Sequence, residues 1–430
     1  MPLGLYISVP FCRTKCSYCN FASGVFSASQ MAQYVDRLSA DVQAIRDFAR
    51  QHDAEIAEPV DTIYLGGGTP SLLPPEEFKK IIFTLRQQFK MLPKVELTVE
   101  CAPGTLTDEM IQAMVTRGVN RVSLGVQSFI DKEAASVGRL HTREKILGDI
   151  ERLRKAGIAN INVDLIAGLP HQTRESWEYS VAEAIASGAP HVSIYMLEVD
   201  EDSRLGRELM AGGTKYHAHH VPNDDLTAEF YETACARLNA AGIQQYEISN
   251  FARAGFESRH NNKYWTRQPY LGFGVDAHSM LPSAADSRAR ETGTDSIRFS
   301  SIDVYDRFLA APEIGITPVS TAQALEESFF LGLRLNRGID LAALQLQFGE
   351  SLAANTPVIN ELVNEGLLAR TGDNLQLTPR GRLLSNEVFE RFIADDHVKT
   401  SLGAAEKSDS TIESSSRAPL DEGALSSAPE

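Results

Sequence analysis

Residues 6–21 read YISVPFCRTKCSYCNF and place Cys12, Cys16 and Cys19 within eight residues. Thiolates at this density usually hold a soft metal or an iron–sulfur cluster. The other two cysteines, Cys101 and Cys235, lie far along the chain, so no nearby fourth thiolate is expected. A four-iron cluster held by three thiolates keeps one iron open to an outside ligand, which indicates chemistry or ligand capture. The alternatives are a zinc site completed by a distant residue, or three unrelated thiols.

The composition indicates a soluble globular protein with one large domain and a smaller one. Of the 430 residues, 43% are hydrophobic and 23% are charged. The sequence contains no apolar run of about 20 residues, so no transmembrane helix is expected, and no signal peptide is visible. Cysteines kept free as ligands favour a reducing cytoplasm. The net charge of −16 argues against nucleic acid as a partner, while peripheral contact with a membrane stays open.

Up to about residue 280, short β-branched runs alternate with amphipathic helical stretches. Apolar residues step by three and four between the runs, as in Met31, Val35 and Leu38. This alternation predicts an α/β fold of repeated βα units around a parallel sheet, closed into a partial or complete barrel. The expected strands are Leu3–Val9, Thr62–Leu65, Glu96–Glu100, Arg121–Val126, Ile161–Leu165 and Val192–Leu197.

The remainder of the chain predicts a smaller helical domain with a hairpin, which resembles a winged-helix module. Its acidity favours a packing domain over a DNA reader. We expect helices at Ala322–Leu335, Leu341–Phe348 and Pro357–Glu365, strands at Leu367–Ala369 and Leu375–Leu377, and a last helix to about Phe392. The predicted domains are a barrel domain over 1–280, a linker over 281–320, a C-terminal domain over 321–395 and a disordered tail over 396–430.

Glycines and polar residues recur where the expected strands end. Residues 66–70 read GGGTP, and consecutive glycines let the backbone approach a ligand closely. Glu100, Gln127 and Asp164 follow on the next three strands and suit hydroxyl groups such as those of a ribose. Arg139 could pair with a ligand carboxylate. Each of these features also has an alternative interpretation when it is taken alone: the glycines as a tight turn, the polar residues as helix caps and Arg139 as an ordinary surface arginine.

In order and spacing, these motifs resemble the radical S-adenosylmethionine superfamily. Within it they resemble the branch that contains oxygen-independent coproporphyrinogen III oxidase and the HemW-type haem chaperones. The matching segments, which run to about Phe392, are YISVPFCRTKCSYCNF, IYLGGGTPS, TVECAPGT, RVSLGVQSF, VGRLH, NVDLIAGLPHQT and HVSIYMLEVD. The resemblance implies a partial (β/α)6 radical-SAM barrel followed by the C-terminal domain.

The resemblance also implies cofactors and the residues that hold them. Cys12, Cys16 and Cys19 would bind a [4Fe-4S] cluster, whose open iron would chelate S-adenosylmethionine. The residues implied to bind S-adenosylmethionine are Gly67, Gly68 and Thr69 at the methionine end, Arg139 at its carboxylate, Glu100, Gln127 and Asp164 at the ribose and neighbouring polar groups, and Tyr6 and Tyr18 at the flanks.

Several positions depart from the oxidase pattern. Phe21 stands where the oxidases carry a further cysteine, Ser8 where a histidine is usual, and Ala102 where an asparagine is common. The oxidases also carry an N-terminal extension, whereas this chain begins five residues before Tyr6. Cys101 should point away from Glu100 into the core, and Cys235 lies on a core-facing helical stripe.

Residues 260–265 read HNNKYW and match the HNxxYW signature of the HemW-type chaperones. The resemblance implies haem contact by His260, Tyr264 and Trp265, since neutral imidazole binds iron and aromatic rings cover a flat porphyrin. The alternative is a structural segment in which the histidine caps a turn and the aromatic rings fill core. His278 is a second haem candidate, with a structural role preferred. The exposed loop with His217, His219 and His220 could bind metal or be incidental.

The function we expect is a cytoplasmic haem chaperone that binds a [4Fe-4S] cluster, S-adenosylmethionine and haem, and delivers haem to acceptor haemoproteins. The enzyme alternative is oxygen-independent oxidative decarboxylation of coproporphyrinogen III in porphyrin biosynthesis. A third class is a structural or regulatory cluster protein that cleaves no cofactor. Phe21 and the HNNKYW segment favour the chaperone. A cluster at an exposed barrel mouth could also support a homodimer.

Overall fold

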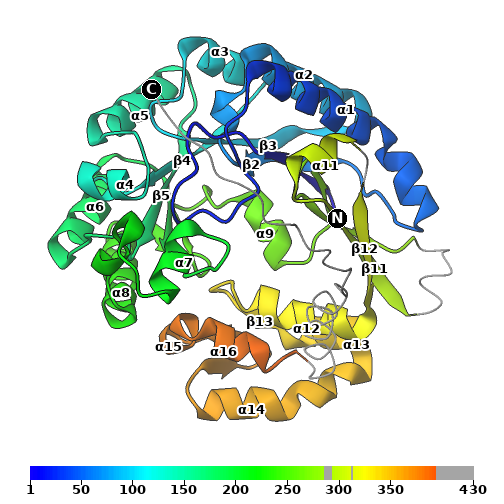
Figure 1. The fold of residues 1–430 in the computed structure, drawn as a ribbon. Coiled ribbons are helices and arrows are strands. Elements are labelled where there is room, and N and C mark those ends of the chain that lie inside the picture. The colour runs from blue at the N-terminus through cyan, green and yellow to red at the C-terminus, as the bar shows by residue number, and fades with distance from the viewer. Residues whose placement is uncertain (285–292, 311–312, 394–430) are drawn as a thin grey trace, which may run out of the picture.

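The computed structural model describes residues 1–284, 293–310 and 313–393 and has a curved parallel sheet at its centre (Figure 1). Its parallel strands include, in neighbouring order, β1 (Leu3–Val9), β2 (Val60–Gly67), β3 (Met91–Cys101), β4 (Arg121–Gln127), β5 (Asn160–Ala167) and β6 (His191–Met196). Each contains most of a strand expected from the sequence. The sheet stays open, because β12 and β7 are its two ends among the described residues. The structure therefore confirms a partial barrel.

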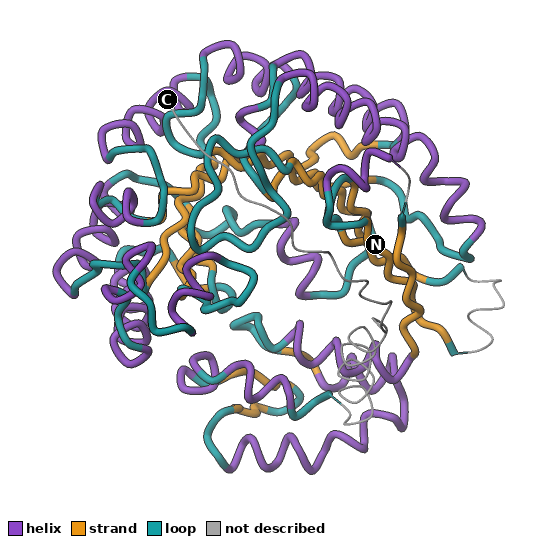
Figure 2. The backbone as a smooth tube through the Cα atoms, viewed as in Figure 1, coloured by secondary structure: helices purple, strands orange, loops and turns teal. Residues whose placement is uncertain are grey.

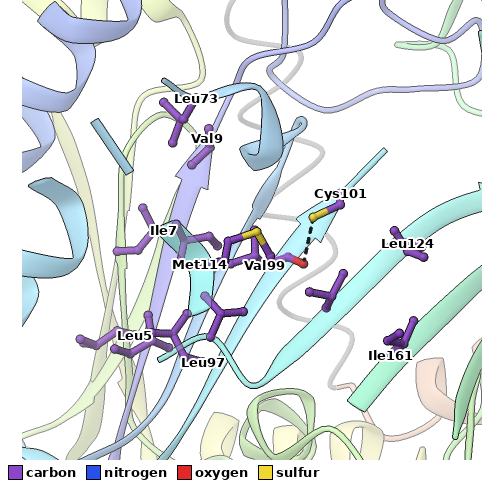
Figure 3. Packing of buried hydrophobic residues seen from close by; sticks show 14 of the residues in the cluster. Leu5, Ile7, Val9, Leu73, Leu97, Val99, Cys101, Met114, Leu124 and Ile161 are labelled. Atoms are coloured by element: carbon purple, nitrogen blue, oxygen red, sulfur yellow. Dashed lines mark hydrogen bonds between the residues drawn. The ribbon is translucent and has the colours of Figure 1, made fainter. Parts of the chain in front are cut away.

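Helices cover the outer side of the sheet, and loops crowd its inner side (Figure 2). The outer layer contains α1 (Ala28–Gln51), α2 (Pro75–Gln88), α3 (Asp108–Thr116), α4 (Asp131–Ser136), α5 (Arg143–Lys155), α6 (Arg174–Ala186) and α8 (Asp224–Ala240). The side chains of Leu5, Ile7 and Val9 point into this layer and pack with Leu97 and Val99 (Figure 3). Since side chains alternate along a strand, Tyr6 and Ser8 face the barrel interior.

A short helix, α9 (Arg259–Trp265), lies on the inner side of the barrel (Figure 1). Gly4 of β1 makes room for this helix, because a Cβ atom there would lie 2.8 Å from Cδ of Lys263 and 3.4 Å from Cε1 of His260. Lys263 is almost fully buried and forms an ion pair of 2.7 Å with Asp61. The HNNKYW segment is thus anchored inside the barrel.

Residues 281–320, expected as a linker, contribute strands to the sheet. The sheet continues from β1 through β9 (Tyr270–Phe273), β10 (His278–Pro282), β11 (Thr294–Ser301) and β12 (Ile314–Ser320), while β8 (Asn250–Ala252) and β7 (Gln244–Gln245) extend its other side. Helix α11 (Tyr305–Ala310) packs on α1 through aromatic contacts between Tyr34, Tyr305 and Phe308. Most of the expected linker is therefore part of the barrel's edge.

The C-terminal region forms its own hydrophobic core below the open side of the barrel (Figure 1). Its elements are α12 (Thr321–Gly332), β13 (Ile339–Asp340), α13 (Leu341–Phe348), α14 (Thr356–Asn364), β14 (Leu368–Thr371), β15 (Asn374–Leu377), α15 (Pro379–Leu383) and α16 (Ser385–Glu390). The expected last helix is broken into two at Leu384. The expected tail 396–430 lies outside the described residues.

Buried ion pairs join the C-terminal region to the barrel. Arg267, which follows α9, lies 2.8 Å from Glu327 of α12, and both side chains are less than 10% exposed. The Arg334 guanidinium lies 4.4 Å from the centroid of the Trp265 ring. No helix within the described ranges is long and apolar enough to cross a membrane.

Candidate functional site

The cysteine loop connects β1 to α1 at the carboxyl end of the parallel strands. Phe11 anchors it, because this ring is fully buried and packs edge-on against Tyr34 at 5.2 Å. The Cys12 amide donates to the Gly24 carbonyl at 2.8 Å, which closes the loop. Cys16 is buried, and Cys12 and Cys19 are partly exposed. All three thiols are free.

The three cysteines are close enough to influence one another's ionisation. Burial raises the pKa of the Cys19 thiol, and the charges of Cys16 and Cys12 act in the same direction. Three neighbouring thiolates therefore need a positively charged group among them. In the described part of the chain, no three His, Cys, Asp or Glu side chains converge on one point as ligands of a single ion. The donor set fits a polynuclear cluster, because each thiolate then binds a separate iron.

The GGGT segment at the end of β2 is tied directly to the cysteine loop. The amide of Gly68 donates to the Val9 carbonyl at 2.9 Å, and the amide of Thr69 donates to the Phe11 carbonyl at 2.7 Å. Gly67 has a φ of +97°, a conformation that favours glycine. A Cβ atom on Gly68 would lie 2.7 Å from the Val9 carbonyl oxygen. The glycines are therefore required for the backbone to run this close to the cysteine loop.

Glu100 and Asp164 lie on the inner face of the sheet, as their positions on β3 and β5 predict. The Tyr64 hydroxyl donates to Oε1 of Glu100 at 2.7 Å, and the Gly67 amide donates to Oε2 at 3.2 Å. Ser123 donates to Asp164 at 2.8 Å. Burial raises the pKa of Glu100 to about 7, and burial also raises the pKa of Asp164. Two poorly solvated carboxyl groups thus face the mouth, ready to accept hydrogen bonds from hydroxyl groups.

Gln127 and Arg139 meet above Gly125. A Cβ atom on Gly125 would lie 3.2 Å from Nε2 of Gln127 and 3.3 Å from a terminal nitrogen of Arg139. Gln127 has a φ of +67°, and its buried Oε1 has no hydrogen-bond partner among the described residues. Strain and an orphaned polar atom together are typical of a binding site. Arg139 donates to the Tyr18 hydroxyl at 3.0 Å, which places Tyr18 on the same wall.

The sequence analysis missed Arg121, a charged residue inside the barrel. Its side chain is 1% exposed, and its Nε has no hydrogen-bond partner in the described structure. On the inner face of β4 it lies two residues before Ser123, which pairs in register with Glu100. Its positive charge lowers the pKa of Glu100 and Asp164, against the larger effect of burial. The sequence did contain a signal for this residue, namely an arginine at an inward-facing position of an otherwise apolar strand.

The three residues expected to contact haem are placed differently from one another. His260 is 1% exposed, and its two ring nitrogens lie 2.9 Å from Oγ1 of Thr62 and 2.8 Å from the Tyr264 hydroxyl. Both nitrogens are therefore engaged within the protein. Tyr264 lines a cavity at the barrel mouth, whereas Trp265 lies under Arg334 of the C-terminal region. His278 lines the same cavity as Tyr264.

Two thiols lie away from the mouth, as expected. Cys101 is buried among core residues and approaches the Val99 carbonyl at 3.8 Å (Figure 3). Cys235 is partly buried against the same core. Among the histidines of the loop at 217–220, His217 Nδ1 lies 3.4 Å from Nε2 of His171, which the sequence analysis did not connect to them.

A second and larger cavity, of about 1030 Å³, lies at the opposite end of the strands. It is bordered by the starts of β3 and β5 near Glu96 and Asn160, by α9, and by the loop at Asn336. None of the cysteines or glycines described above lines it. Size alone therefore does not locate the chemistry of this protein.

Comparison with known proteins agrees with this geometry. Residues 6–184 match the radical SAM superfamily, and residues 319–384 match the HemN C-terminal domain. The fold and site thus define a radical SAM protein with a HemN-type C-terminal domain. The chain is 34% identical over 395 residues to the heme chaperone HemW of Bacillus subtilis (strain 168), covering 91% of this chain and 99% of that protein. The chain belongs to the HemW heme chaperone family.

Two further matches support the assignment. The heme chaperone HemW of Lactococcus lactis subsp. lactis (strain IL1403) is 33% identical over 402 residues, covering 92% of this chain and 98% of that protein. Among solved structures, the radical SAM enzyme coproporphyrinogen III oxidase (HemN) from Escherichia coli matches with a TM-score of 0.75 at 22% identity, covering 91% of this chain and 90% of that chain. The latter likeness establishes the fold.

Proposed function

We propose that the protein is a haem chaperone that binds a [4Fe-4S] cluster, S-adenosylmethionine and haem, and passes haem to acceptor haemoproteins. The observation that carries the proposal is the meeting, at one barrel mouth, of the cysteine loop, the GGGT segment and an aromatic cavity. That cavity is lined by Phe21, Tyr264 and Gly67, so it touches both the cluster loop and the glycine segment. The HemW names of the relatives point to the same cargo.

Cys12, Cys16 and Cys19 would hold the cluster. When bound, such a cluster supplies an iron that is open to an outside ligand and an electron for cleavage of a sulfonium. Thr69 approaches Sγ of Cys12 through its hydroxyl at 3.8 Å, a weak contact to the thiolate. The partly exposed cysteines leave one side of the loop accessible to a ligand.

The residues around the mouth would orient S-adenosylmethionine. Gly67 and Gly68 leave the backbone free of side-chain bulk, and together with Thr69 they would receive the methionine end. The Arg139 guanidinium would pair with a carboxylate. The ribose hydroxyl groups and neighbouring polar atoms would be held by Glu100, Gln127 and Asp164, and the cofactor would be flanked by Tyr6 and Tyr18.

Tyr264 would contact haem directly, while His260 and Trp265 would hold Tyr264 and α9 in place. His260 does so through its hydrogen bond to the Tyr264 hydroxyl, and Trp265 through the Arg334 contact. We place the protein in the cytoplasm, because its five cysteines are free in the structure and thiols stay reduced there. A homodimer formed at the barrel mouth is a further part of the proposal.

A second candidate is oxygen-independent coproporphyrinogen III oxidation, favoured by the shared fold with the Escherichia coli oxidase. The two functions differ in their product. In an oxygen-free assay, the reconstituted protein is given S-adenosylmethionine together with either coproporphyrinogen III or haem. Stoichiometric haem uptake, transfer to an apo-haemoprotein and no decarboxylation support the chaperone. Steady formation of protoporphyrinogen contradicts it.

The cluster requirement is tested in the same assay. Cys12→Ser removes one of the three proposed ligands and is expected to abolish the cluster absorbance, whereas Cys235→Ser, at a partly buried thiol away from the mouth, leaves it intact. Equal iron content in both variants would remove Cys12 from the site.

A further inference from the structure

A cavity of about 270 Å³ opens at the barrel mouth between the cysteine loop and the edge formed by β9 and β10. Its walls include Tyr6, Phe21, Gly67, Tyr264, Tyr270 and His278. These residues come from three separate stretches of the chain, residues 6–21, Gly67 and residues 264–278, so the fold, not a local motif, assembles the cavity. Four of its ten lining residues are tyrosine or phenylalanine, and one is histidine.

His278 is the accessible imidazole of this cavity. As the first residue of β10, it keeps 70% of its side chain exposed. Its Nε2 lies 3.7 Å from Oδ1 of Asp276, which is longer than a hydrogen bond. Within the described ranges no hydrogen bond engages its ring. His260, by contrast, is buried with both nitrogens occupied.

The aromatic walls suit a flat, apolar ligand. The rings of Tyr264 and Tyr270 meet edge-on, with centroids 4.7 Å apart. Phe21 of the cysteine loop lines this cavity and is 56% exposed. A planar macrocycle bound here would cover the Phe21 ring, and binding would be favoured because the apolar surface of Phe21 is removed from water.

We propose that His278 is the axial ligand of haem iron and that the macrocycle packs against Phe21 and the Tyr264–Tyr270 wall. The inference rests on the proposed haem-binding function and names its site. Neutral imidazole is a common iron ligand. A carboxylate that accepts a hydrogen bond from the other ring nitrogen strengthens such a ligand, and Asp276, 3.7 Å from Nε2, is the carboxylate near enough to take this role when haem binds. The cavity is below the roughly 300–1,000 Å³ of sites that enclose a whole ligand. Part of the macrocycle therefore stays exposed, as transfer to an acceptor requires.

The test compares three histidine variants of the cluster-loaded, full-length protein. His278→Ala is expected to weaken haem binding by about tenfold or more and to abolish the histidine-ligation signature in the Soret and EPR spectra. Added imidazole is expected to restore that signature. His260→Ala keeps the signature, and His219→Ala, at an exposed histidine outside the cavity, leaves affinity and spectra unchanged. Unaltered cluster absorbance in each variant reports an intact fold.

A second variant tests the wall rather than the ligand. Phe21→Ser is expected to weaken haem binding by about three- to tenfold with an unchanged ligation signature, because apolar contact is lost and the iron bond is kept. Wild-type haem spectra in His278→Ala overturn the inference while leaving the chaperone function in place. A wild-type protein that takes up no haem overturns both.

Discussion

The Nε2 atom of His260 and the hydroxyl of Tyr264 are hydrogen-bonded at 2.8 Å, and Nδ1 of the same ring lies 2.9 Å from Oγ1 of Thr62. His260 thus connects the inner face of β2 to the tyrosine that lines the mouth cavity. Burial lowers the pKa of His260 to about 3, so the ring stays neutral and can accept one hydrogen bond while donating the other.

This relationship predicts that His260 acts through Tyr264. His260→Ala removes two buried hydrogen bonds and is expected to lower the free energy of unfolding by about 2–4 kcal/mol. Haem affinity falls moderately because Tyr264 loses its orientation, while the cluster spectrum is retained. Denaturant unfolding and haem titration measure the two effects. Tyr264→Phe, which keeps the ring, is the matched control, and a haem affinity equal to wild type in His260→Ala contradicts the prediction.

Glu100 makes stability depend on pH. Its folded-state pKa of about 7 exceeds the value of about 4.3 in an unfolded chain. Between these values the folded protein holds a proton that the unfolded chain has lost, so this group lowers stability as pH rises from about 4.3 to about 7. Glu100→Gln removes the effect and is expected to be more stable than wild type at pH 8 by about 3 kcal/mol, with little difference at pH 4.

Urea unfolding of the cluster-free protein at several pH values checks this expectation. Glu232→Gln serves as the control, because Glu232 is an exposed glutamate on α8. If Glu100→Gln and wild type lose stability in parallel as pH rises, Glu100 is not the group responsible.

Arg121 is expected to keep the two mouth carboxylates ionised. Arg121→Gln removes the positive charge that opposes the effect of burial on Glu100 and Asp164, so their pKa values rise further. Affinity for S-adenosylmethionine at neutral pH should fall by about three- to tenfold. Calorimetric titration at pH 7 and pH 9 should show the deficit shrinking at the higher pH. Arg121→Lys retains the charge and is the control; a deficit independent of pH would indicate a purely structural role.

Glu327 is expected to hold the C-terminal region to the barrel. It pairs with Arg267 at 2.8 Å and with Arg298 at 2.9 Å while only 8% exposed. Glu327→Gln breaks a buried pair and should lower the free energy of unfolding by about 3 kcal/mol. The exposed Arg307–Glu313 pair gives the control, since Glu313→Gln should cost less than about 1 kcal/mol. Thermal unfolding compares them, and equal losses would contradict the prediction.

The parallel strands, and the gathering of polar residues on their inner face, could be predicted because both follow from local patterns. Inward and outward residues alternate along β1 and β3. Gly67 and Glu100 lie at or next to the last residue of their strands, and Asp164 lies three residues before the end of β5. Parallel strands bring their carboxyl ends together, so sequence order alone places these residues at one mouth.

The remaining features depend on contacts between distant segments. Strands β11 and β12 contain serines, threonines and a proline, and only their antiparallel pairing identifies them as part of the sheet. The sequence grouped Tyr264 with Trp265, but Trp265 packs under Arg334, which follows α12 in the C-terminal region. The cavity around His278 likewise joins three stretches of the chain that no motif connects.

Gly67 and Tyr6 border the aromatic cavity and also belong to the proposed cofactor wall. When two ligands contact the same residues, the binding of one can change the affinity for the other, and this coupling is equal in both directions. Whatever factor S-adenosylmethionine applies to the affinity for haem, haem must apply to the affinity for S-adenosylmethionine. Under the proposed function, an acceptor that removes the cargo would therefore also reset how tightly the protein retains its cofactor.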